Sequence, residues 1–177
     1  MAGSALAFSV IYFASDVIEA AQGGFSDFQL ALTLVAEIAV PFFVIALYLV
    51  QRPAIGRLGR IGSIGYAYAY AFFSFTVVYA LAEGVGDYGA LSEDLGLSMF
   101  LHGAVMLLAG LAFGYATVRA GVFPVWTGVA LMVGVVAVSA TQSAPEGVQL
   151  VAAGVRALGF AGMGLSVIRS ASSDQQE

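Results

Sequence analysis

The segment QLALTLVAEIAVPFFVIALYLV, residues 29–50, decides the fold class of this chain. It holds a single charged residue, Glu37, and is close to the about 20 residues that a helix needs to cross roughly 30 Å of hydrocarbon. Over the whole chain 60% of the residues are hydrophobic and 10% are charged, whereas soluble domains carry roughly 25% charged residues. These values predict an integral membrane protein.

Apolar stretches of similar length recur along the chain. They cover residues 64–86, 97–118, 122–141 and 149–168. The stretch 4–21 is less apolar because it contains Asp16 and Glu19. We interpret it as a span and not as a cleaved signal peptide, because no basic residue precedes it and acids replace the small residues of a cleavage site.

The sequence therefore predicts an all-α integral membrane protein with a compact bundle of six transmembrane helices. We expect one domain over residues 1–170, followed by a short cytoplasmic polar tail over residues 171–177. The succession of short spans, with segments such as RAGVFPVWTG (residues 119–128), is similar to many small bacterial polytopic proteins, a similarity that names no family.

The arginines predict the orientation, because loops rich in Arg stay in the cytoplasm. The loops on one side and the end of the last span carry Arg52, Arg57, Arg60, Arg119 and Arg169. The loops on the other side carry only acids, namely Asp27, Asp87, Glu93, Asp94 and Glu146. We therefore predict a multi-pass protein of the cell membrane with both termini inside.

Missing residue types exclude several chemistries. The chain has no Cys, and its basic residues are all arginines, so thiolate catalysis and Schiff bases are impossible. A single His cannot form a bis-His haem, and no helical pair of metal ligands, phosphate-binding glycine loop or basic nucleic-acid face is present. We expect no cofactor, no metal and no nucleic-acid partner.

Ionisable residues inside the predicted spans carry most of the functional information, since each costs roughly 2.5–3.5 kcal/mol at a helix centre. They are Asp16, Glu19, Glu37, Glu83, His102 and Arg156. All of them fall in the outer half of the bilayer or at its midplane, which predicts one pocket there. Glu19 and Glu83 lie near enough to the surface to be hydrated instead.

Helical periodicity assigns these residues to faces. Tyr12, Asp16 and Glu19 share one stripe of the first span. In later spans His102 shares a face with Met106, and Arg156 shares a face with Phe160. We expect Arg156, Tyr12, Glu19, Met106, Phe160 and Glu83 to contact a substrate in the pocket.

Glu37 is the deepest of these residues, and Pro41 follows it by four positions. Proline has no N–H to bond the carbonyl of the residue four before it. The sequence therefore predicts that the helix bends at Glu37, with a free carbonyl beside its carboxyl group. Because burial disfavours the charged form, we expect Glu37 to hold a proton.

Three functions remain open. The first is acid–base catalysis on a small isoprenoid-, quinone- or sterol-like molecule, with Glu37 as the acid, His102 or Asp16 as its partner, and Arg156 fixing a polar group. The second is proton-coupled transport or a proton pathway through the same residues. The third is an accessory or scaffold subunit, in which His102 makes an interhelical hydrogen bond and Arg156 pairs with a carboxylate.

Small residues predict where helices come close together. Gly110 and Gly114 form a G-x-x-x-G pair, and Ala153, Ala157 and Ala161 repeat at four-residue spacing. A homodimer formed through these faces and packing within one bundle both explain the pattern. Membrane lipid is the other expected partner.

Overall fold

The computed structural model describes residues 2–173, which form helices and no strands. The seven helices are α1 (Ala2–Gln22), α2 (Asp27–Val50), α3 (Gly56–Glu83), α4 (Tyr88–Leu95), α5 (Leu97–Ala120), α6 (Val125–Ala140) and α7 (Glu146–Ser173). The all-α prediction is confirmed. Of the predicted polar tail, residues 174–177 lie outside the described residues, and α7 includes the rest.

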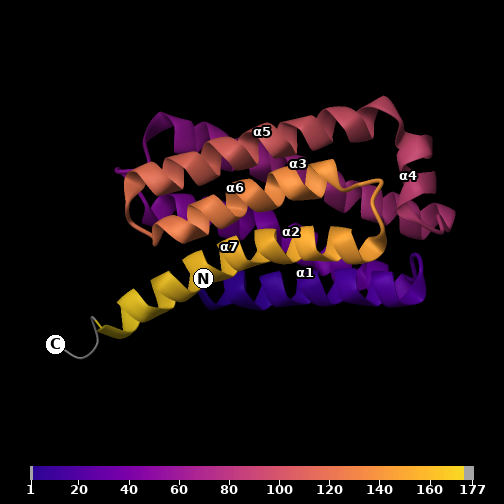
Figure 1. Ribbon diagram of the computed structural model, residues 1–177, viewed down its shortest axis with the longest axis horizontal. Helices are drawn as coiled ribbons and strands as arrows, with labels where there is room; N and C mark the ends of the chain where they lie inside the picture. Colours follow the sequence, from indigo (N-terminus) through magenta and orange to yellow (C-terminus); the bar gives the residue numbers. More distant parts are fainter. Residues whose placement is uncertain (1, 174–177) are drawn as a thin grey trace.

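The long helices run side by side, and the short helix α4 lies across one end of the bundle (Figure 1). Each long helix contacts the next one in chain order, from α1 through α2, α3, α5 and α6 to α7. Helix α7 also packs on α1. The helices therefore close into a ring, so side chains from all of them meet in its interior.

Four helices among the described residues are long and apolar enough to cross a membrane: α2, α3, α5 and the part of α7 from Glu146 to Ser170. Helix α6 is apolar but has 16 residues, or about 24 Å of rise. The four long apolar helices indicate a multi-pass membrane protein.

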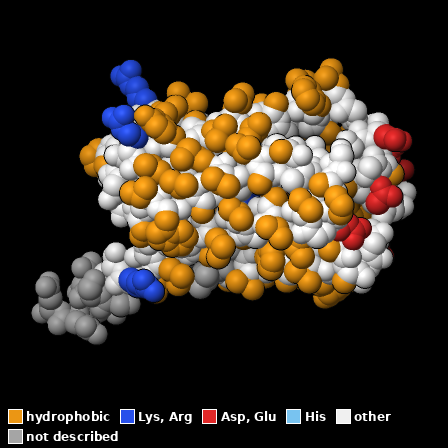
Figure 2. Space-filling model, viewed as in Figure 1, with side chains coloured by type: hydrophobic (Ala, Val, Ile, Leu, Met, Phe, Trp, Pro, Cys, Tyr) orange, Lys and Arg blue, Asp and Glu red, His pale blue; other side chains and the backbone are white. Residues whose placement is uncertain are grey.

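Charged side chains gather at the two ends of the bundle, with apolar side chains between them (Figure 2). Arg52, Arg57, Arg60 and Arg119 lie exposed at one end, here called the arginine end. Asp87, Glu93, Asp94 and Glu146 lie exposed at the other end, the acidic end. The sides expose large apolar residues such as Phe42 (73%) and Phe100 (72%), as a surface in contact with lipid does.

Helix α3 begins at Gly56, well before the predicted residue 64. Its first turns pack closely on α5, because a Cβ atom at Gly62 would lie 2.5 Å from the backbone nitrogen of Phe113. The glycine allows the two helix backbones to approach, and residues 56–63, which precede the predicted span, are helical.

The expected loop near residue 90 contains helix α4. The Asp87 side chain accepts a hydrogen bond from the Ala90 N–H at 2.9 Å and so caps the helix start. Gly96 ends the helix at a φ of +48°, a backbone conformation that favours glycine.

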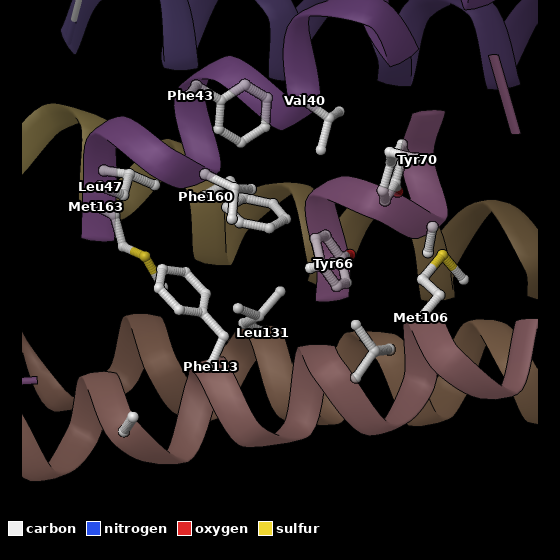
Figure 3. Packing of buried hydrophobic residues seen from close by; sticks show 14 of the residues in the cluster. Val40, Phe43, Leu47, Tyr66, Tyr70, Met106, Phe113, Leu131, Phe160 and Met163 are labelled. Atoms are coloured by element: carbon white, nitrogen blue, oxygen red, sulfur yellow. The ribbon is translucent and has the colours of Figure 1, made fainter. Parts of the chain in front are cut away.

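A densely packed apolar core fills the ring on the side of the arginine end (Figure 3). The Phe160 ring lies at its centre, 5.1 Å from the Phe43 ring and 5.8 Å from the Tyr66 ring. Leu131, Phe113 and Met163 complete this part of the core. Phe160, which was expected to contact substrate, is a core residue.

The G-x-x-x-G face of α5 is used within the chain. A Cβ atom at Gly110 would lie 2.9 Å from both the Tyr66 ring and the Val135 side chain. One at Gly114 would lie 2.6 Å from the Met132 side chain. Packing within one bundle accounts for this face, and the homodimer stays a prediction.

Candidate functional site

A cavity of about 210 Å³ lies inside the ring of helices, towards the acidic end. Each of the seven helices contributes to its lining. The lining begins at Glu37 and Arg156, which are buried, and extends to Gln142 and Glu146, which are exposed. The cavity thus connects the two most buried charged side chains with the surface of the acidic end.

Glu37 occupies the buried end of the cavity and is 5% exposed. Its Oε1 atom accepts a hydrogen bond from the Tyr12 hydroxyl at 3.3 Å. Its Oε2 atom is buried and has no hydrogen-bond partner among the described residues. Helix α2 continues through Pro41, which cannot offer an N–H to the Glu37 carbonyl. The carboxyl oxygens and the backbone carbonyl oxygen of Glu37 therefore place several hydrogen-bond acceptors at the buried end of the cavity.

Arg156 approaches the same end of the cavity from α7 and is 7% exposed. Its guanidinium carbon lies 5.0 Å from the centre of the Tyr12 ring and 6.0 Å from the centre of the Tyr70 ring. These are cation–π distances. The nearest described partners of the guanidinium are therefore tyrosine rings, and Asp16 adds a weaker electrostatic attraction.

The backbone around Arg156 is held by close contact between α6 and α7. A Cβ atom at Gly134 would lie 2.4 Å from the Arg156 Cα atom. Because real Cβ atoms do not approach so closely, only glycine allows α6 to pack at this distance. The position of Arg156 therefore depends on Gly134.

A polar network joins α1 and α2 beside the cavity. The Gln29 Nε2 group lies 3.1 Å from Glu19 Oε2, 3.2 Å from Ser15 Oγ and 3.0 Å from Thr33 Oγ1. The Ser15 and Thr33 hydroxyls are also hydrogen bonded to each other. This network fixes the helix that carries Tyr12 and Asp16 against the helix that carries Glu37.

Tyr88 and Gln142 lie near the exposed end of the cavity. The Gln142 Nε2 group donates to the Tyr88 hydroxyl at 3.5 Å. Burial, and then the negative charges of Glu37 and Glu19, raise the pKa of the Tyr88 phenol. Tyr88 is therefore a neutral hydroxyl at the entrance.

The structure brings six of the nine predicted site residues to one cavity. Those that line it are Glu37, Asp16, Arg156, Tyr12, Glu19 and Met106. Glu83 is exposed at the end of α3, and neither it nor Phe160 lines the cavity. The catalytic and binding roles of these residues stay predictions.

His102 does not line the cavity either. It lies between α5 and α3, stacked on Phe72 with 3.6 Å between ring centres. Its Nδ1 atom is 2.8 Å from the Ser98 carbonyl, and its Nε2 atom is 2.9 Å from the Tyr68 hydroxyl. Since a carbonyl only accepts, Nδ1–H donates to Ser98, and in the neutral imidazole Nε2 accepts from Tyr68. This is the interhelical hydrogen bond that the sequence left open as an alternative.

The sequence analysis missed several lining residues, among them Gln29, Thr33 and Tyr70. A signal for two of them was present, because Gln29, Thr33 and Glu37 recur every four residues on one face of α2. Tyr70 gave none, since it belongs to a run of tyrosines that also suits a membrane interface.

Among the described residues, no group of three His, Cys, Asp or Glu side chains is placed to hold a metal ion. No protein-family model, curated protein or solved structure matches the chain.

Proposed function

We propose that the protein is a six-span protein of the cell membrane whose cavity performs acid–base chemistry on a small hydrophobic molecule. The observation that carries this proposal is the Glu37 carboxyl group, which is buried at the cavity end with one oxygen unpartnered. Both termini lie in the cytoplasm, and the acidic end faces outwards.

The separation of charge supports this topology, because arginine-rich loops stay in the cytoplasm. The arginines lie in or next to the α2–α3 and α5–α6 connections, whereas the acids lie in or next to the connections at the other end. Helices α1 and α6 run alongside the four long apolar helices (Figure 1). A bilayer that the four long apolar helices span therefore also surrounds α1 and α6.

Glu37 suits the role of a proton donor. A buried carboxylate oxygen with no partner is costly, whereas a protonated carboxyl group needs one acceptor for its O–H. With Oε1 accepting from Tyr12, the proton belongs on Oε2, which has no partner within the described chain. Asp16 lines the same cavity and is the group that would take a proton back.

The size of the cavity restricts the substrate. Its volume of about 210 Å³ is below the roughly 300–1,000 Å³ of pockets for drug-sized ligands. It admits a small molecule or the head group of an isoprenoid- or quinone-like compound, but not the rigid body of a sterol. Leu30, Phe73 and Val77 supply the apolar part of its wall.

A proton-coupled carrier is the second candidate, and one observation favours it. The carboxyl side chains of Glu37, Asp16, Glu19 and Glu146 line the cavity from its buried end to its exposed end. Asp16 and Glu19 lie about 4.5 Å apart along the axis of α1. A series of acids in this order would exchange protons between Glu37 and the outer solution.

Infrared spectroscopy of the protein in lipid nanodiscs tests the role of Glu37. We expect a carbonyl band of a protonated carboxyl group at neutral pH, which Glu37→Gln removes. Glu83→Gln is the matched control, because Glu83 is exposed and does not line the cavity. A band of unchanged intensity in Glu37→Gln would rule out the proton-donor role and leave the scaffold function.

Product formation separates the two remaining functions. Membrane extract incubated with wild-type protein in detergent should yield a product by mass spectrometry, and Glu37→Gln should yield none. A carrier would form no product in detergent and would instead acidify proteoliposomes in the presence of its substrate.

Impermeant thiol labelling tests the topology in this Cys-free chain. Ala90→Cys and Ser143→Cys lie exposed at the acidic end, whereas Ala54→Cys and Val122→Cys lie exposed at the arginine end. On intact cells only the first pair should react. Labelling of the second pair alone would reverse the orientation.

A further inference from the structure

We infer that the occupant of the cavity is an uncharged molecule with an acceptor oxygen, such as a carbonyl, which the Arg156 guanidinium binds. This inference rests on the proposed function and assigns a ligand class to its site. It concerns recognition by Arg156, whereas the proposed function concerns proton exchange by Glu37.

Arg156 brings a permanent charge and five N–H donors to the buried end of the cavity. The Tyr12 and Tyr70 rings stabilise the charge, but ring faces are poor substitutes for hydrogen-bond acceptors. No carboxylate of the described chain pairs with the guanidinium. None of the guanidinium nitrogens is among the buried side-chain atoms that lack a partner within the described chain, and Arg156 lines the cavity, so an acceptor oxygen of a ligand can reach its N–H donors there.

The charges along the cavity disfavour an ionic ligand. An anion would have to pass Glu146, Glu19 and Asp16 to reach Arg156. A cation that reached the buried end would meet the fixed positive charge of Arg156. A neutral molecule avoids both repulsions.

The apolar lining of the cavity also disfavours an ionic ligand. Leu30, Phe73, Val77 and Met106 line the cavity, and apolar walls make the loss of water around an ion expensive. A carbonyl oxygen loses only its hydrogen bonds to water, which Arg156 replaces. Its two lone pairs also allow a second bond from a protonated Glu37, so one oxygen would satisfy both residues.

Four small probes built on the same ring test the ligand class: cyclohexanone, cyclohexanecarboxylate, cyclohexylammonium and the zwitterion aminocyclohexanecarboxylate. Binding to the protein in nanodiscs is measured by the shift in melting temperature and by the infrared carbonyl stretch of isotope-labelled cyclohexanone. We expect the ketone to bind most tightly, with its stretch lowered by hydrogen bonding.

Arg156→Met should weaken ketone binding by about tenfold or more and abolish the lowered stretch. Arg119→Met is the matched control, because Arg119 is exposed at the arginine end and contacts Tyr115. If Arg156→Met fails to fold, Arg156→Lys replaces it. It keeps the charge but loses the planar fork, so it too should weaken binding.

Tighter binding of any charged or zwitterionic probe would overturn the inference. So would unchanged ketone binding in the folded Arg156 variant, or binding of none of the four probes. Glu37→Gln should still bind the ketone, because the amide also donates a hydrogen bond. If a charged probe binds most tightly and Glu37→Gln removes the carboxyl band, only the ligand class is refuted. If the ketone binds most tightly and Glu37→Gln leaves the carboxyl band unchanged, only the proposed function is refuted.

Discussion

His102 and Arg156 both lie in apolar helices, but the rest of the chain gives their polar atoms different partners. Both ring nitrogens of His102 have partners, and its ring is stacked on Phe72. Arg156 has two aromatic rings beside its charge and no ion pair within the described chain. Its neighbour Glu37 keeps one oxygen without a partner.

This difference distinguishes a structural polar group from a candidate site. Insertion of either residue into lipid is costly, and hydrogen bonds within the chain repay the cost for His102. For Glu37 part of the cost remains, because one of its buried oxygens has no partner within the described chain, and both Glu37 and Arg156 line a cavity that could hold a ligand. The unmet bonding capacity, rather than the charge itself, marks the functional region.

The largest effect on stability is expected from a methyl group added beside Arg156. Gly134→Ala would place its Cβ atom 2.4 Å from the Arg156 Cα atom and force α6 away from α7. Overpacking of this kind costs about 1–3 kcal/mol. Unfolding in mixed detergent micelles measures the loss, and binding of cyclohexanone should weaken as well.

Gly103→Ala, next to His102, is the matched control. No atom lies within 4 Å of the Cβ position at Gly103. Alanine in a helix interior is more stable than glycine by roughly 0.5–1 kcal/mol, so this variant should be as stable as the wild type or more so. Equal losses at both positions would show that the region around Arg156 is not specially constrained.

A double-mutant cycle tests the partner of Arg156. Tyr12→Leu combined with Arg156→Met should show a coupling energy of about 0.5–2 kcal/mol, as expected for a cation–π contact away from water. Asp16→Asn combined with Arg156→Met should show less, because the two side chains form no ion pair. A larger coupling with Asp16 would restore the carboxylate partner that the sequence suggested.

The sequence predicts the elements well where hydrophobic length and periodicity determine them. The segment 29–50 lies within α2, and residues 66–73, YAYAYAFF, which belong to the predicted span 64–86, are helical within α3. The stripe of Tyr12, Asp16 and Glu19 does line one cavity. In each case the pattern belongs to one helix, so a single sequence can reveal it.

The sequence fails where the answer depends on neighbouring helices. His102 shares a helix face with Met106, yet only Met106 lines the cavity, because the contacts with Phe72 and Tyr68 on α3 hold the imidazole elsewhere. Phe160 shares a face with Arg156, but one turn further along α7 the core has already filled the interior. Periodicity identifies a face, whereas the extent of a cavity along it depends on packing.

The smallest effect is expected at His102. Phenylalanine at this position can keep the stack on Phe72 and loses only the hydrogen bonds to Tyr68 and Ser98. Interhelical hydrogen bonds in membranes contribute on average about 0.6 kcal/mol, so His102→Phe should lower unfolding stability by roughly that amount. His102→Ala loses the stack as well and should cost more. Neither variant should change the Glu37 carboxyl band or the binding of cyclohexanone, because His102 does not line the cavity. Loss of either signal in a stable His102→Phe protein would place the imidazole in the functional pathway, and satisfied hydrogen bonds would then no longer identify a structural residue in this bundle.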